Sequence, residues 1–285
     1  MCETEVILEK YLSVPRTIGI EKLEVVLLDE SGDTNVNLKK GGKKTKYFLI
    51  ATLILSPKCY SELSRELVRA FEEMASVVGC EDIIKKMIEG GIELKYNSLT
   101  GELVKCFKGT ETKEVNEAID EALGKFFDVV TSLRTCSSMR ALIHYVNKAE
   151  IAKFLKGLGE FSEPLREALS KTMKPYVFNN VKTELCNSLI EDALVLFDEK
   201  FFSWRGISDR ELPKRRFQCY KVVDAMEVKS HHALPFAIVD VLAGSYRNAL
   251  LHRNERLKEK LAFARGFDLT SNFVGELCEV IGRAC

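Results

Sequence analysis

The most informative stretch of the sequence is Glu24-Val25-Val26-Leu27-Leu28-Asp29-Glu30-Ser31-Gly32-Asp33, where an apolar run meets acidic and turn-forming residues. The run from Leu23 to Leu28 predicts a short buried strand that stops abruptly at Asp29. A second apolar run, Tyr47 to Leu55, follows after a polar stretch that contains glycine and asparagine. The two runs together predict a β-hairpin with a long loop.

Beyond this hairpin, helical and strand patterns alternate. Ser56-Pro57 supplies an N-cap and a first-turn proline for a helix that ends at Gly79. Apolar residues at helical spacing predict helices over 115–133, 148–189 and 234–252, whereas short apolar runs predict strands over 139–146, 193–197 and 222–228. Two further helical segments are expected at the end of the chain. This order predicts an α/β fold with a mixed sheet and helices on both faces.

Composition narrows the class of protein. With 285 residues, 46% of them hydrophobic and 29% charged, the chain is globular, and it shows no linker that would mark a domain boundary, so one domain is expected. The 42 basic residues balance the 42 acidic ones, which leaves no general attraction to polyanions. No apolar stretch reaches the roughly 20 residues that span a bilayer, and the N-terminus lacks a secretion signal. We therefore expect no membrane contact and a cytoplasmic protein.

The cysteines carry no metal-binding pattern. The nine cysteines are scattered and include no Cys-x-x-Cys pair, which argues against structural zinc or an iron–sulfur cluster. Buried free thiols are the expectation, with disulfides as the alternative if the source is a hyperthermophile.

Three acids occur where apolar segments are expected to be buried: Asp29, Asp198 and Asp240. A carboxylate taken out of water costs several kcal/mol unless it is protonated, hydrogen-bonded, paired or bound to a metal. Three such groups from distant parts of the chain suggest one shared site. Their mutual repulsion would require a counter-cation, and hard oxygen ligands favour Mg²⁺ or Mn²⁺.

Each acid also has a simpler explanation. Asp29 and Asp198 stand at strand ends, where aspartate commonly forms a turn or caps a helix. Asp240 lies too far into its helix for a cap, and an ion pair with a nearby Lys or Arg is the alternative. Gly244 follows one helical turn later and would allow a substrate or another backbone to approach.

The opening motif Asp29-Glu30-Ser31-Gly32-Asp33 resembles the signature of the domain of unknown function 3800 family, which is taken to adopt a ribonuclease-H-like fold. Later segments agree in order; they are Ile92-Glu93-Leu94-Lys95, Asp198, Val228-Lys229-Ser230 and Ile238-Val239-Asp240-Val241-Leu242-Ala243-Gly244. The resemblance covers about residues 24–251, with a helical insertion at about 148–190 and a helical extension at 252–285. The chain departs from the family in having Ala237 where a Gln is usual and Val239 where an Ala is usual.

The resemblance implies a nuclease that hydrolyses phosphodiester bonds by a two-metal mechanism. In this arrangement Asp29 bridges two Mg²⁺ or Mn²⁺ ions, Asp198 and Asp240 each bind one, and Glu93 is a direct or water-mediated ligand. Glu30 or Glu199 could replace Glu93. Supporting or substrate-binding roles fall to further residues of these segments: Glu30, Ser31, Asp33, Lys95, Glu199, Lys229, Ser230 and Arg247. Lys95 could turn toward a scissile phosphate, and a solvated lysine is the alternative.

The expected partner is nucleic acid, DNA or RNA. Basic residues gather in two loops, at Lys39, Lys40, Lys43, Lys44 and Lys46 and at Lys214, Arg215 and Arg216. These are either clamps for a phosphate backbone or ordinary solvated turns. Trp204 could stack on a base or hold its loop down, and His231-His232 could transfer protons, bind a metal or simply begin a helix.

Other classes of enzyme lack their motifs. An aspartyl-phosphate phosphatase needs a second Asp two positions after the first, where this chain has Ser31. Neither a P-loop nor a dinucleotide-binding Gly-x-Gly-x-x-Gly is present. The alternative to a nuclease is a ribonuclease-H-like domain without catalytic activity that binds nucleic acid or protein, and the Gln replaced by Ala237 favours that alternative.

Overall fold

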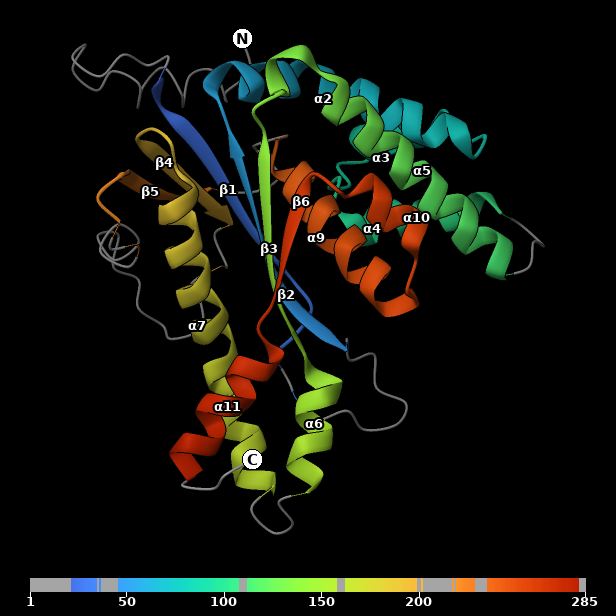
Figure 1. The fold of residues 1–285 in the computed structure, drawn as a ribbon. Helices are drawn as coiled ribbons and strands as arrows, with labels where there is room; N and C mark the ends of the chain where they lie inside the picture. The colour runs from blue at the N-terminus through green and yellow to red at the C-terminus, as the bar shows by residue number, and fades with distance from the viewer. Residues whose placement is uncertain are drawn as a thin grey trace.

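The computed structural model describes residues 22–34, 36, 46–107, 112–157, 162–198, 201, 217, 219–228 and 235–281. Its six strands form one mixed sheet in the order β5-β4-β1-β2-β3-β6 (Figure 1). The strands are β1 (Glu24–Ser31), β2 (Tyr47–Leu55), β3 (Arg140–Asn147), β4 (Ala193–Asp198), β5 (Val222–Val228) and β6 (Ala264–Asp268). The first three pair antiparallel, whereas β4 runs parallel to β1, β5 parallel to β4 and β6 parallel to β3. The expected hairpin, α/β class and mixed sheet are confirmed.

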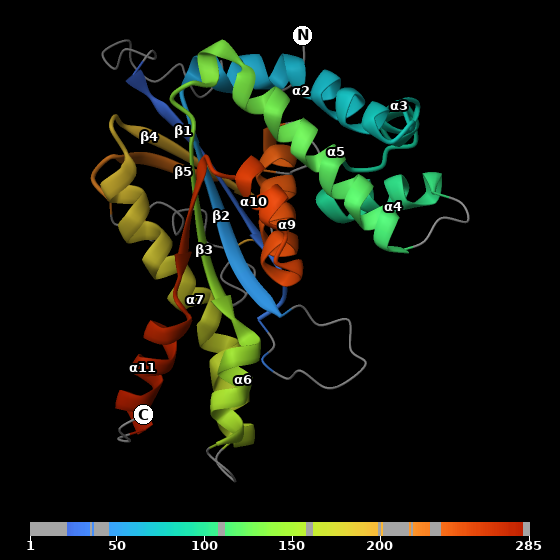
Figure 2. The ribbon, with the colours of Figure 1, turned by 45° about the vertical axis from the view of Figure 1, so that its right-hand side comes forward.

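Helices cover both faces of this sheet (Figures 1 and 2). One face carries α2 (Pro57–Val77), α3 (Ile83–Glu89), α4 (Tyr96–Cys106), α5 (Thr112–Ser132), α9 (Pro235–His252) and α10 (Glu255–Lys260). The other carries α6 (Lys148–Lys156), α7 (Ser162–Ser188) and α11 (Thr270–Ile281). We refer to these as the α9 face and the α7 face. A short 3₁₀ turn, η2 (Arg134–Cys136), precedes β3.

The central strands are apolar along their length because both of their faces are covered. In β1, Val25 and Leu27 belong to the apolar cluster on the α9 face, and Val26 and Leu28 belong to the cluster on the α7 face. This alternation follows from the two-residue period of a strand. It also decides the face on which each residue after Leu28 lies.

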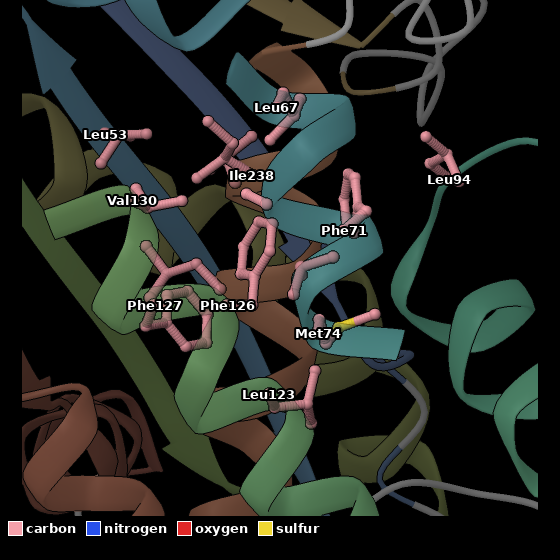
Figure 3. Close-up of a cluster of buried hydrophobic side chains, with 14 of the residues drawn as sticks. Leu53, Leu67, Phe71, Met74, Leu94, Leu123, Phe126, Phe127, Val130 and Ile238 are labelled. Atoms are coloured by element: carbon pink, nitrogen blue, oxygen red, sulfur yellow. The ribbon is translucent and has the colours of Figure 1, made fainter. Parts of the chain in front are cut away.

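The α9-face core is built mainly by two long helices and the sheet beneath them. Ser56 caps α2 by accepting a hydrogen bond from the backbone N–H of Cys59 at 3.2 Å, and Pro57 occupies its first turn, as expected. Phe71 of α2 stacks on Phe126 of α5 with ring centroids 4.7 Å apart (Figure 3). Leu94, in the segment between α3 and α4, is part of the same cluster. The burial of Leu94 in this cluster fixes the position of the residues on either side of it.

Two expectations are wrong. The C-terminal extension is not only helical, because Ala264–Asp268 adds β6 to the edge of the sheet beside β3. The cysteines are not all free thiols, because disulfides join Cys59 to Cys136, Cys80 to Cys106 and Cys186 to Cys219. Within the described ranges, no helix has both the length and the apolar character needed to cross a bilayer.

Candidate active site

The site begins with Asp29, near the end of β1. Continuing the alternation of the strand, Asp29 follows Val25 and Leu27 onto the α9 face, and the residue is buried, with 7% of its surface exposed. The backbone N–H of Glu30 donates to Asp29 Oδ1 at 2.7 Å. Ser31 lies two residues further on the same side of the strand. Asp29 is therefore a buried acid inside the sheet rather than an exposed turn former.

Asp240 reaches Asp29 from above the sheet. It is on the second turn of α9, which packs on β1 and β2, and its carboxyl group is hydrogen-bonded to that of Asp29. Asp240 also accepts a hydrogen bond from the backbone N–H of Tyr96, the first residue of α4. The N-terminus of α4 thus directs at this carboxylate a backbone N–H that has no partner within the helix, together with the positive end of the helix dipole.

Gly244 explains how α4 comes so close to α9. A Cβ atom at this position would overlap the ring of Tyr96. The space beside Asp240 that the sequence suggested for a substrate is therefore filled by Tyr96. Arg247 lies one helical turn further along α9. Its guanidinium group is over the Tyr96 ring, with the guanidinium carbon 6.0 Å from the ring centre.

Asp198 approaches from the neighbouring strand. It ends β4, which runs parallel to β1 with Phe197 opposite Leu28. Leu194 and Leu196 belong to the α9-face cluster, so the period of the strand places Asp198 on that face as well. Asp29 and Asp198 consequently occupy the same end and the same face of adjacent parallel strands.

Glu93 and Lys95 enter from the segment before α4. Leu94 is buried in the α9-face core, and the two flanking side chains lie together, with Lys95 Nζ 3.3 Å from Glu93 Oε2. The same ammonium group is 3.5 Å from Asp198 Oδ2. Lys95 is an extended N-cap residue of α4, and only 32% of its side chain is exposed. It is an integral part of the acidic site rather than a solvated lysine.

The electrostatics of the site show an excess of negative charge. Burial, the neighbouring Asp240 and, more weakly, Asp198 hold the pKa of Asp29 well above its usual range. Burial also raises the pKa of Asp240, although the Tyr96 N–H, Lys95 and the hydrogen bond with Asp29 oppose that rise. Burial would lower the pKa of Lys95, but Asp198, Glu93 and Asp29 outweigh burial, and the pKa is raised. The site therefore favours a bound proton or another cation.

Two residues of the opening motif serve other contacts. Glu30 points to the α7 face, where Lys174 of α7 pairs with its carboxylate, so Glu30 does not replace Glu93 in the site. Asp33 pairs with the fully buried ammonium group of Lys148, whose Nζ lies 2.7 Å from the Asp33 carbonyl oxygen and 3.1 Å from Oδ1. Asp33 thus ties the end of β1 to the start of α6.

Several expected residues lie outside the described ranges. These are Glu199, Lys229, Ser230, Lys39, Lys40, Lys43, Lys44, Trp204, Lys214, Arg215, Arg216, His231 and His232. Sequence reasoning, in turn, did not select Tyr96 or Lys174. The alternation of β1 contains the signal for Lys174, because Asp29 and Glu30 must face opposite sides and each needs its own partner.

The donor set fits a hard divalent cation. The converging side chains of Asp29, Glu93, Asp198 and Asp240 offer only carboxylate oxygens, the ligands preferred by Mg²⁺ and Mn²⁺. Among the residues that the structure describes, no three His, Cys, Asp or Glu side chains surround a ready-made metal position. The side-chain contacts explain this absence, because Asp29 contacts Asp240, whereas Glu93 and Asp198 contact Lys95.

Comparison with known proteins found no match: no family model fits the chain, and no curated protein or solved structure resembles it closely enough to be matched.

Proposed function

We propose that this protein is a metal-dependent nuclease with a ribonuclease-H-like fold, in which Asp29, Glu93, Asp198 and Asp240 bind Mg²⁺ or Mn²⁺. The observation that carries the proposal is the direct contact between the buried carboxyl groups of Asp29 and Asp240. Two such groups repel each other unless a proton or a cation lies between them. A fold that holds them together is therefore suited to bind a cation.

The places from which the acids come support the ribonuclease-H-like assignment. The first acid is on the first strand of a hairpin, the second precedes a helix, the third ends another strand and the fourth is on a late helix. This is the order implied by the family that the opening motif resembles. The mixed sheet with helices on both faces agrees with the same assignment.

The charge balance supports metal-dependent chemistry. The site contains four carboxyl groups and one ammonium group, that of Lys95, which contacts Glu93 and Asp198, and Lys174 neutralises the charge of Glu30 on the other face of the sheet. Divalent ions bound here would activate water and stabilise the leaving oxygen of a phosphodiester. Asp29 would be the carboxylate between the other ligands, because the charges of Asp240 and Asp198 both raise its pKa, and the Tyr96 N–H would keep Asp240 oriented. No covalent nucleophile is required, and the proposed substrate is DNA or RNA.

The test is cleavage of single-stranded DNA, double-stranded DNA, RNA and a hybrid with Mg²⁺ or Mn²⁺. We expect cleavage by the wild type and a loss of at least 100-fold in Asp29→Asn and Asp240→Asn. Asp128→Asn is the matched control, because Asp128 is an exposed residue of α5 that pairs with Lys260. Equal cleavage by wild type and both site variants would show that the activity belongs to a contaminant or to another site.

A second candidate is a noncatalytic module that binds nucleic acid or protein. The observation in its favour is Lys95, which neutralises part of the acidic site without a metal. A titration with Mn²⁺ separates the two functions, since a noncatalytic scaffold of this kind would show no binding that depends on Asp29 or Asp240.

A further inference from the structure

The acids of the site fall into two pairs with different partners. Asp29 and Asp240 contact each other, whereas Glu93 and Asp198 both contact the Lys95 ammonium group, at 3.3 and 3.5 Å. One half of the site therefore already contains a positive charge. In the other half, no lysine or arginine of the described residues forms an ion pair with Asp29 or Asp240, and Lys95 acts on them only through its more distant charge.

The position of Lys95 is imposed by its neighbours. Leu94 is anchored in the core on one side, and on the other side Tyr96 is held by its N–H bond to Asp240 and by the packing of its ring on Gly244. The backbone of Lys95 is extended, with φ −98° and ψ 154°, as the N-cap of α4. Because the backbone of Lys95 is fixed on both sides, its ammonium group stays close to Glu93 and Asp198.

From this division we propose that the site binds one divalent ion, between Asp29 and Asp240, and that the Lys95 ammonium group takes the place of a second ion. This inference rests on the proposed nuclease function and changes its metal requirement. A second divalent ion on Glu93 and Asp198 would lie next to the lysine ammonium, and their repulsion opposes binding. Lys95 would present its N–H donors to a phosphate oxygen, which makes it a substrate-contacting residue rather than a metal ligand.

The test is the stoichiometry of Mn²⁺ binding to the full chain, measured by isothermal titration calorimetry and by electron paramagnetic resonance. We expect one Mn²⁺ per wild-type chain and two in Lys95→Met, with the two ions spin-coupled because sites of this kind lie about 3.5–4 Å apart. Lys95→Arg keeps the positive charge and should bind one ion. Circular dichroism checks the fold, and Lys95→Gln replaces Lys95→Met if the latter unfolds.

The matched control is Lys105→Met, which removes an exposed lysine of the same segment that also pairs with a carboxylate, that of Glu102. It should bind one Mn²⁺, as the wild type does. Two ions in the wild type, or one ion in Lys95→Met, would overturn the role of Lys95 and leave the nuclease proposal standing. No Mn²⁺ bound by any of these proteins would overturn the metal site and the nuclease proposal together.

Discussion

The carboxyl groups of Asp29 and Asp240 are hydrogen-bonded to each other at the junction of β1 and α9. Burial is the main cause of the raised pKa of both residues, and the proximity of Asp240 raises that of Asp29 further. In a metal-free protein at neutral pH, this pair opposes folding because an ionised carboxylate is kept out of water. The same arrangement gives the site its affinity for a cation, so function and stability are in conflict at this point.

Replacing Asp29 separates its effect on the stability of the fold from its effect on the binding of a cation. A carboxyl group with a raised pKa in the folded state stabilises the fold below its unfolded pKa of 3.8, and that stabilisation is lost as pH rises through the folded value. Asp29→Asn should therefore raise the free energy of unfolding at pH 7.5 by about 1–2 kcal/mol in EDTA. Urea denaturation measures this. The control Asp128→Asn should change stability by less than about 0.5 kcal/mol, and a destabilised Asp29→Asn would contradict the expectation.

Metal addition should stabilise the protein in a way that depends on pH. At a free Mn²⁺ concentration 100 times the dissociation constant, binding adds about 2.7 kcal/mol to the stability. Protons compete for Asp29 and Asp240, whose pKa values are raised, so the same Mn²⁺ concentration should stabilise the protein less at pH 5 than at pH 7.5. Thermal denaturation with and without Mn²⁺ measures the difference. Equal stabilisation at both pH values would argue against these two ligands.

A methyl group at Gly244 should disturb the site through Tyr96. The added Cβ in Gly244→Ala would overlap the Tyr96 ring and push α4 away from α9, at a cost of about 1–3 kcal/mol. Cleavage should fall as well, because the Tyr96 N–H would no longer hold Asp240. Gly101→Ala is the control within α4, since nothing lies within 4 Å of its added Cβ, and it should stabilise the helix by up to about 1 kcal/mol. Equal effects of the two substitutions would show that α4 is not tightly packed on α9.

His144 should make the fold sensitive to acid independently of the acidic site. It is fully buried on β3, stacks on Phe267 with ring centroids 4.5 Å apart, and neither ring nitrogen has a hydrogen-bond partner in the described part of the chain. Burial lowers the pKa of His144 from 6.5 to about 4, so the unfolded chain binds the extra proton first, and stability is lost as pH falls from 6.5 toward 4.

The loss assigned to His144 amounts to about 2.5 kcal/mol at pH 4.5. His144→Phe keeps the ring stack and cannot be protonated, so the fall in its unfolding free energy between pH 7.5 and pH 4.5 should be smaller by that amount. Urea denaturation at the two pH values measures it. Parallel losses in wild type and variant would assign the acid sensitivity to other groups.

The disulfide Cys80–Cys106 should support the site, because it joins the two ends of the segment that carries Glu93, Lys95 and Tyr96. Replacing both cysteines with serine should lower stability by about 2–4 kcal/mol and weaken Mn²⁺ binding. Replacing Cys186 and Cys219 is the control, since that disulfide joins α7 to the segment before β5. This second double replacement should lower the stability by a similar amount without changing the Mn²⁺ dissociation constant. Unchanged Mn²⁺ binding in both variants would mean that packing alone positions Tyr96, whose N–H holds Asp240.

Much of the fold was predictable because both faces of the sheet are covered. That coverage makes the runs at β1, β2 and β4 apolar, and it makes an acid within or beside them stand out. β6 was missed because Ala264–Asp268 is short, contains charged residues and a glycine, and has no β-branched side chain. Its Gly266 is explained only by the tertiary structure, where the Tyr246 hydroxyl occupies the place of a Cβ.

The site was predictable only in part. The apolar context of Asp29, Asp198 and Asp240 indicates a shared site, and the structure brings these acids together with Glu93 and Lys95. The partners of individual groups depend on long-range packing, as with Lys174 at Glu30 and Lys148 at Asp33. The contact between Tyr96 and Gly244 joins two helices whose approach no local pattern specifies.

The most direct test of cation binding by this acidic site is anomalous X-ray scattering from crystals of the wild-type protein grown with Mn²⁺. We expect an anomalous peak coordinated by the carboxylates of Asp29 and Asp240, and no peak there in Asp29→Asn crystals grown in the same way. Wild-type crystals that contain Mn²⁺ elsewhere but show no density between these two residues would contradict the assignment of a metal site.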